Sequence, residues 1–127
     1  MRHPRQIIVI GEEIEDALPA LLPSLEAHGL RVVKARTPGD LELLLPESEA
    51  TTIVAYEAAG SDAVRRVLNA VSEMQRRIPV VVVAERGSFD EYYELMSEGA
   101  YDYFDLREGA GPIERSVEWA AVGSRAA

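Results

Sequence analysis

The chain contains no cysteine, so a disulfide framework, a thiol nucleophile and a thiolate metal site are all excluded. Basic residues are also fewer than acidic ones. Thirteen Lys and Arg stand against 22 Asp and Glu, which gives a formal net charge of -9 at pH 7. Affinity for nucleic-acid phosphates comes largely from clustered Lys and Arg, and in this sequence the basic residues are scattered. The composition therefore argues against direct nucleic-acid binding.

Long apolar runs are absent as well. No run approaches the ~20 residues that a membrane-spanning helix needs, and residues 1–5 lead into a predicted strand without the apolar core of a signal peptide. We therefore expect no membrane contact and a cytoplasmic location. The 127 residues suit one domain, with a folded core over about 5–122 and a tail or the start of a linker at 123–127. This ending is compatible with a piece of a longer regulator as well as with a stand-alone protein.

What the chain does contain is a regular alternation of strand and helix signals. Short apolar runs predict strands at 7–10, 31–35, 52–56, 79–84 and 101–104, and the unbroken Val/Ile runs among them are typical of strands buried on both faces. Apolar residues at helical spacing predict helices over 12–28, 40–45, 64–74, 88–99 and from 112 onward. This alternation predicts a flavodoxin-like doubly wound α/β fold, with a five-stranded parallel sheet of order 2-1-3-4-5 and helices on both faces.

Two local patterns make sharper predictions. Pro19 and Pro23 lie inside the first helical pattern. If the helix begins near Asp16, Pro19 is tolerated, whereas Pro23 should remove one backbone hydrogen bond and bend the helix. Ser88 and Glu91 match a capping box, in which each side chain accepts a hydrogen bond from the backbone N–H of the other residue.

The second half of the chain carries a family resemblance. The strand at 79–84, the helix that ends in Glu98-Gly99 and the strand at 101–104 resemble the fourth strand, fourth helix and fifth strand of a response-regulator receiver (CheY-like) domain. The frame covers nearly the whole chain. Receiver domains hold Mg²⁺ with two acidic residues after strand one and accept phosphate on an Asp at the end of strand three. A Ser or Thr after strand four and a Lys after strand five hold the phosphoryl group.

The acidic pair of the family falls on Gly11-Glu12, or on Glu12-Glu13 if the strand end slips by one residue. Two carboxylates suit a hard divalent cation, but acidic residues here also stabilise a helix N-terminus through its macrodipole. Glu12 and Glu13 are therefore weak metal candidates, and we expect no resident metal. His3 and His28 lack the spacing of a metal site, and His28 is expected to be a polar helix end.

The other positions depart from the family pattern. The acceptor position falls on Tyr56, whose phenol cannot form an acyl phosphate, and Glu57 would resemble a fixed negative charge if a shortened loop moved it into the site. Ala84 stands at the Ser or Thr position without a hydroxyl, and Leu106 stands at the Lys position. Arg107 is one residue away, and its planar guanidinium is not equivalent to an ammonium at the site.

Together these departures predict a pseudo-receiver. This would be an atypical, phosphorylation-independent signalling domain, without enzyme activity or cofactor, that acts through protein contacts in a bacterial two-component-type or transcriptional regulator. The alternative is a divergent receiver that still binds Mg²⁺ with Glu12, Glu13 and Glu57. It would be phosphorylated or switched at this acidic rim, the edge of the sheet at which the strands end. A third possibility is a small-ligand sensor that reuses the vacant rim. Fold-level analogy does not decide between them.

An output surface is also predicted. Tyr103 falls at the aromatic switch position of the family and, because Ala84 leaves space beside it, we predict that one rotamer holds it permanently. The helix after residue 88, the strand at 101–104 and the last helix carry large adaptable side chains: Tyr92, Tyr93, Met96, Tyr101, Tyr103 and Trp119. We expect this face to bind a protein partner or a second copy of the chain. Packing into the core is the other interpretation of these side chains.

Overall fold

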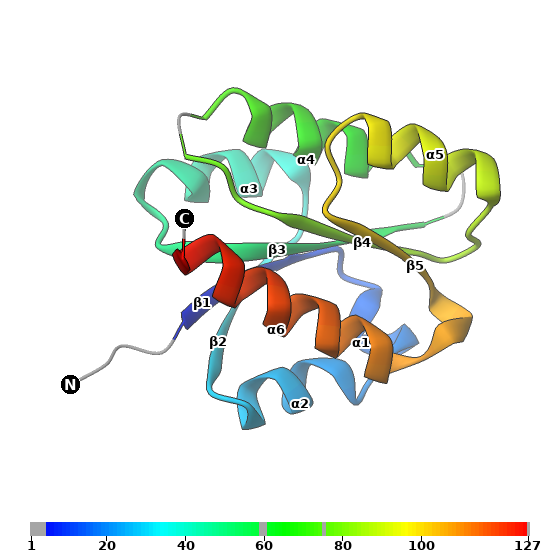
Figure 1. Cartoon of the computed structure of the whole chain (residues 1–127), viewed down its shortest axis with the longest axis horizontal. Helices are drawn as coiled ribbons and strands as arrows, with labels where there is room; N and C mark the ends of the chain where they lie inside the picture. Colours follow the sequence, from blue (N-terminus) through cyan, green and yellow to red (C-terminus); the bar gives the residue numbers. More distant parts are fainter. Residues whose placement is uncertain (1–4, 59–60, 75, 127) are drawn as a thin grey trace.

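The computed structural model describes residues 5–58, 61–74 and 76–126, and its centre is one parallel sheet (Figure 1). The strands are β1 (Arg5–Ile10), β2 (Leu30–Ala35), β3 (Ala50–Glu57), β4 (Val80–Ala84) and β5 (Asp102–Asp105). They lie in the order β2-β1-β3-β4-β5, and every pairing is parallel. The predicted doubly wound sheet of order 2-1-3-4-5 is confirmed.

Helices cover both faces of the sheet (Figure 1). One face carries α1 (Ile14–Ala17), α2 (Leu21–Ala27) and α6 (Ala110–Ala126), and the other carries α3 (Pro38–Leu44), α4 (Ala63–Ser72) and α5 (Phe89–Ser97). Short 3-10 turns, η1 (Leu45–Glu47) and η2 (Leu106–Glu108), follow α3 and β5. Helix α6 extends to Ala126, beyond the residue at which the folded core was expected to end. Within the described ranges, no helix has the length and apolarity to cross a bilayer.

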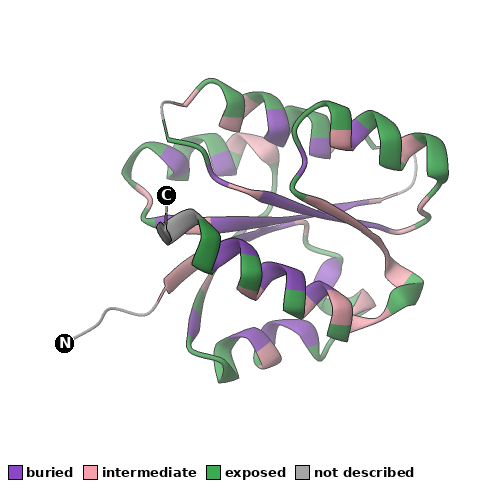
Figure 2. Cartoon of the chain, viewed as in Figure 1, coloured by how far each residue is buried: buried purple, intermediate pink, exposed green. Residues whose placement is uncertain are grey.

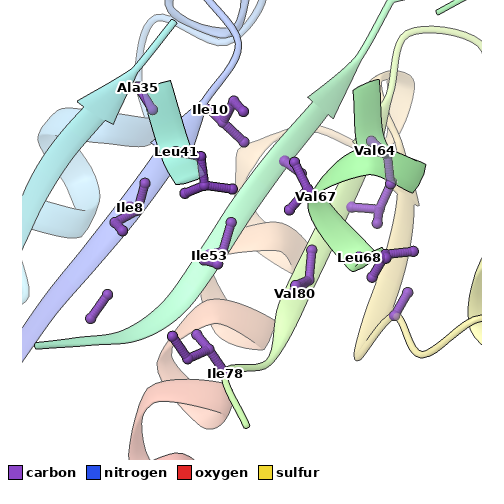
Figure 3. Packing of buried hydrophobic residues seen from close by; sticks show 14 of the residues in the cluster. Ile8, Ile10, Ala35, Leu41, Ile53, Val64, Val67, Leu68, Ile78 and Val80 are labelled. Atoms are coloured by element: carbon purple, nitrogen blue, oxygen red, sulfur yellow. The ribbon is translucent and has the colours of Figure 1, made fainter. Parts of the chain in front are cut away.

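Alternate residues of each strand supply two separate cores. Ile8 and Ile10 of β1 point toward α3, α4 and α5, where they join Ile53, Val64 and other residues (Figure 3). Ile7 and Val9 point to the opposite face and pack with residues of α1, α2 and α6. Because successive side chains of a strand alternate in direction, an unbroken apolar strand fills both cores. Figure 2 shows the result, with buried residues along β1, β3 and β4 and exposed residues on the outer helix faces.

The first helical segment differs from its prediction. It forms two helices, α1 and α2, with a break at Leu18-Pro19-Ala20. A residue before proline is pushed away from the helical region, and Leu18 has φ -134° and ψ 75°. Pro23 is the third residue of α2, in the first turn, where a missing N–H has no intrahelical partner to lose. The prediction that Pro23 bends the helix was wrong, because Pro19 ends it first.

The capping box predicted at Ser88 and Glu91 is only half formed. The Ser88 hydroxyl accepts a hydrogen bond from the Glu91 N–H at 3.1 Å, as expected. The Glu91 carboxylate instead accepts the hydroxyl of Tyr103 at 2.7 Å, and the Ser88 N–H donates to the same tyrosine oxygen at 3.1 Å. The phenol therefore replaces the carboxylate as the acceptor at the start of α5. A full reciprocal cap occurs at the start of η2, between Asp105 and Glu108.

Candidate functional site at the carboxyl rim of the sheet

The positions compared with the receiver pattern meet at one edge of the sheet. The carboxyl ends of β1, β3, β4 and β5 lie side by side because all these strands are parallel (Figure 1). In the ladder, Glu57 is paired with Ala84, and Ala84 is paired with Asp105. We call this edge the rim. The structure thus brings the positions predicted from the sequence together at one edge of the sheet.

The acidic side of the rim lines a cavity of about 300 Å³. Its walls include Gly11, Glu12, Glu13, Arg36 and Tyr56. Glu12 forms an ion pair with Arg36, and both side chains are more than half exposed. One of the two carboxylates that line the cavity is therefore already paired with a cation of the chain itself.

Gly11 and Tyr56 fit against each other at the floor of this cavity. Gly11 has φ +118°, in the region that side-chain-bearing residues rarely adopt. A Cβ atom added to Gly11 would lie 2.9 Å from the Cβ of Tyr56, inside van der Waals contact. The glycine at position 11 is thus required both by its backbone conformation and by the side chain of Tyr56.

Tyr56 is held as a neutral phenol. Its side chain packs with the core under α1, α2 and α6, and the residue is only 7% exposed. The hydroxyl donates to Glu85 Oε2 across 3.4 Å. Burial raises the pKa of Tyr56, and the nearby carboxylates of Glu85 and Glu13 raise it further. This hydroxyl is therefore a hydrogen-bond donor and not an activated nucleophile.

Glu57 lies on the other face of the sheet. Its carboxylate accepts the backbone N–H of Val64, in the first turn of α4, at 3.4 Å. Burial raises the pKa of Glu57, the charges of Glu91 and Asp62 act in the same direction, and the Val64 N–H and Arg65 oppose them. Glu57 does not line the cavity that Glu12 and Glu13 share. The structure therefore does not bring together the three carboxylates of the predicted magnesium alternative.

The two remaining positions offer no polar group to the cavity. Ala84 is buried, and Leu106 packs against the core under α1, α2 and α6. Arg107 binds Asp105 through two guanidinium nitrogens, at 2.9 and 2.8 Å. Asp105 also accepts the N–H of Gly87 at 2.7 Å, and these contacts, above all those with Arg107, hold the pKa of Asp105 well below its usual range. The guanidinium of Arg107 is directed to its own neighbour and not into the rim.

Tyr103 connects β5 to the start of α5. Its hydroxyl donates to Glu91 and accepts from the Ser88 N–H, the two contacts that replace half of the capping box. Burial is the largest cause that raises the pKa of Tyr103, and the bond to Glu91 adds to it. The ring is therefore tied to α5 at its polar end. That it keeps one rotamer permanently remains a prediction.

Solved structures of known proteins share this fold. No protein-family model matches the chain, and no curated protein matches it. Solved structures do. The receiver domain described as that of a LuxO repressor protein from Vibrio parahaemolyticus superposes with a TM-score of 0.83 at 15% identity, over 98% of this chain and 94% of that one. The chain has the receiver fold.

Two further receiver-fold structures agree. A response-regulator receiver domain from Clostridium thermocellum gives a TM-score of 0.79 at 18% identity, covering 95% of this chain and 97% of that one. A response regulator from Burkholderia pseudomallei, solved with a phosphorylated aspartic acid and a calcium ion, gives 0.75 at 18% identity, over 96% of this chain and 71% of that one. The TM-scores establish the shared fold, and identities this low carry no conclusion beyond it.

The predicted output surface of this receiver fold divides into two patches. Near the start of α5, Phe89 is 71% and Tyr93 is 61% exposed, and their rings meet edge to face with centroids 4.9 Å apart. Tyr92 touches both rings and also the ring of Tyr103. We call Phe89, Tyr92 and Tyr93 the α5 aromatic patch. Phe89 was not among the residues predicted for this surface, although its position next to a helix cap, one turn before Tyr93, was a usable signal.

The second patch lies at the other end of β5. The Ser116 hydroxyl of α6 donates to Asp102 at 2.8 Å, which places the second turn of α6 beside the start of β5. Trp119, 71% exposed, and the exposed Tyr101 belong to this end. Met96 belongs to neither patch, because it is partly buried and packs against the core under α3, α4 and α5. The ring pairs of the described residues include neither Tyr101 nor Trp119, so the aromatic residues expected on one face form two groups.

A cluster remote from the rim was not predicted. His28, which follows α2, lies 3.0 Å from Glu114 Oε1 of α6, and Glu118 is one helical turn further along. Within the described part of the chain, these three residues are the one group of three side chains suited to hold a metal ion. The pKa of His28 is raised, first by its bond to the Ser24 carbonyl and then by Glu118 and Glu114. Their separation in the sequence hid the cluster, because only the docking of α2 on α6 creates it.

Proposed function

We propose that the chain is a signalling domain with a receiver fold that acts through protein contacts and is not switched by aspartyl phosphorylation. The observation that carries this proposal is Tyr56. At the position where the family pattern has an Asp acceptor, the chain presents a buried phenol bonded to Glu85. An acyl phosphate needs a carboxylate, and the nearest one along the strand, Glu57, faces the other side of the sheet.

The surroundings of Tyr56 support the same proposal. Phosphoryl transfer depends on positioned donors and cations that stabilise the charge on the transferred group. Ala84 has no hydroxyl, Leu106 has no charge, and Arg107 is bound to Asp105. The domain would then need no cofactor, would not be an enzyme, and would serve a two-component-type or transcriptional regulator by docking.

A second candidate function rests on Glu12 and Glu13. Both line the 300 Å³ cavity, as a divergent receiver that binds Mg²⁺ and is switched at its rim would require. Against it stand the ion pair of Glu12 with Arg36 and the orientation of Glu57 toward Val64. Such a receiver would have to break the first contact and rotate the second side chain.

Amide NMR spectra of the whole chain, recorded with Mg²⁺ and then with beryllofluoride, distinguish these candidates. Beryllofluoride mimics the phosphoryl group on an acceptor carboxylate. We expect the amides of Glu12, Glu57 and Tyr103 to keep their shifts in both steps. Saturable shifts that begin at Glu12 and Glu13 and spread to Tyr103 would establish the divergent receiver instead. The double variant Glu12→Gln, Glu13→Gln is the matched control, since it must abolish any genuine rim response.

For the docking surface we propose the α5 aromatic patch with β5 and α6, in contact with a partner protein or a second copy of the chain. Exposed aromatic rings in mutual contact are enriched at protein interfaces. Sedimentation of wild type and of Tyr93→Ser over a range of concentrations tests the homodimer. A dimer that both Tyr93→Ser and Trp119→Ser dissociate uses the whole surface, whereas a dimer that only Tyr93→Ser dissociates uses the α5 aromatic patch alone. A wild-type monomer at all concentrations leaves the heterologous partner as the proposal.

A further inference from the structure

The side chains of His28, Glu114 and Glu118 converge at the junction of α2 and α6. The two helices share a core, in which Leu25 and Ile113 are fully buried, so their relative position is fixed by packing. Glu114 and Glu118 are four residues apart and therefore occupy the same face of α6. His28 stands at the end of α2, half exposed, so the cluster is open to ions from solvent.

The spacing of the three groups suits one metal ion. One nitrogen of His28 and one carboxylate oxygen from each glutamate lie within 4.8 Å of one another. Metal–ligand bonds of about 2.0–2.2 Å at tetrahedral or octahedral angles put neighbouring ligand atoms about 3–3.5 Å apart. The three ligand atoms therefore have to approach one another by less than about 2 Å to reach metal-bound spacing.

Ser24 supports one of the three ligands from behind, because its hydroxyl donates to Glu114 Oε2. Such outer contacts orient metal ligands in known sites. The Ser24 carbonyl accepts from Nδ1 of His28 at 2.8 Å in the metal-free protein, a bond that metal binding at Nδ1 would replace. Among the ion pairs of the described residues, none joins Glu114 or Glu118 to a Lys or Arg, whereas Glu12, Glu15 and Glu94 each have a basic partner. Within the same residues, the basic partner of Glu114 is His28.

We propose that His28, Glu114 and Glu118 bind a divalent first-row transition metal, with Zn²⁺ as the best match, and that the ion clamps α2 to α6. An imidazole with two carboxylates is a ligand set for Zn²⁺ or Mn²⁺, whereas Mg²⁺ selects oxygen ligands alone. In the bound state, the metal takes the place of the proton that Nδ1 shares with its two oxygen neighbours. Water completes the coordination on the exposed side. The site is independent of the rim and of the proposed function.

Calorimetric titration of the untagged full chain with Zn²⁺ tests the site. We expect one equivalent to bind, and His28→Gln and Glu118→Gln each to weaken binding by about tenfold or more. Glu26→Gln removes the same charge from exposed α2 surface, and His3→Ala removes the other imidazole; both should bind as wild type does. The absence of binding to the wild type, or equal binding by His28→Gln and Glu118→Gln, would overturn the proposal.

Paramagnetic broadening by Mn²⁺ locates the ion without any substitution. Substoichiometric Mn²⁺ should first broaden the amides around His28, Glu114 and Glu118. Broadening that starts instead at Gly11 to Glu13 would place the cation at the rim, reject this site and favour the divergent receiver. Because the two sites lie on different elements, failure of one proposal is recognised separately from failure of the other.

Discussion

The middle of the sheet and its carboxyl rim follow different rules. In the middle, Ile8, Ile53 and Val81 are fully buried in apolar clusters on the two faces, and these side chains need no polar partner. At the rim, polar groups are paired within the chain itself: Tyr56 with Glu85, Tyr103 with Glu91, and Arg107 with Asp105. The middle determines the fold, while the rim carries polar groups bonded to one another. A fold can therefore persist while the chemistry at its rim is replaced.

The largest effect should come from the middle of the sheet. Ile53→Ala removes buried methyl groups between β3 and the helices of that face, and the cavity should destabilise the chain by about 2–5 kcal/mol. Urea unfolding followed by circular dichroism measures it. The control, Tyr56→Phe, deletes one rim hydroxyl and should cost much less. Equal losses for the two variants would erase the distinction between middle and rim.

Among the rim residues, Asp105 should contribute most to the free energy of unfolding. Asp105→Ala removes the cap of η2 together with the contacts to Gly87 and Arg107, and we expect a loss of about 0.5–2 kcal/mol in urea unfolding at pH 7. The folded-state pKa of this carboxyl is depressed, so its contribution is present above the unfolded pKa and disappears as pH falls through the folded value. The difference between wild type and variant should therefore shrink in acid. A constant difference across pH would contradict this account.

Tyr103→Phe sharpens the comparison further. The variant keeps the ring but leaves the Ser88 N–H and the Glu91 carboxylate without the hydroxyl, at a cost of about 1 kcal/mol. Tyr93→Phe is the matched control on exposed surface and should be neutral. With fluorotyrosine at position 103, ¹⁹F NMR should give one sharp resonance for this ring, as a single rotamer requires. Two resonances in slow exchange would refute the fixed rotamer.

Glu57→Gln should give the smallest change and the opposite sign. The pKa of Glu57 is raised above its ordinary 4.5, so the stability linked to its neutral form is present below the unfolded pKa and is lost as pH rises through the folded one. A glutamine stays neutral and can still accept the Val64 N–H. We expect a higher melting temperature than wild type at pH 7, and no advantage in acid. A lower melting temperature at pH 7 would mean that the charge itself is stabilising.

The sheet could be predicted from the sequence because its signals are local. Apolar runs such as Val80–Ala84 predict a buried strand. Because these runs alternate with helical patterns, only a few sheet topologies are compatible with the sequence. The prediction for the first helical segment was wrong because the segment contains two prolines. The spacing of its leucines does not reveal which proline ends a helix and which one lies inside it. Only half of the predicted capping box forms, because the hydroxyl of Tyr103, twelve residues beyond Glu91, donates to the Glu91 carboxylate.

The candidate site was predictable only as a set of positions. The resemblance located Tyr56, Ala84 and Leu106 at the rim, but the direction of Glu57 depends on the strand register, and the split of the aromatic face depends on how α5 and α6 flank β5. The cluster of His28 and Glu114 was invisible for a related reason. Its members are 86 positions apart (114 − 28), and no periodic pattern links residues across that distance.

The close fit of Gly11 against Tyr56 couples the two positions. A side chain at position 11 alone would collide with the Cβ of Tyr56 and would have to adopt a positive φ. An Asp at position 56 alone would exchange a buried ring for a carboxylate and leave a void beside the glycine. Each of these single substitutions therefore gives a less stable protein. An acidic residue can enter this part of the sheet edge at low cost only if both positions change together.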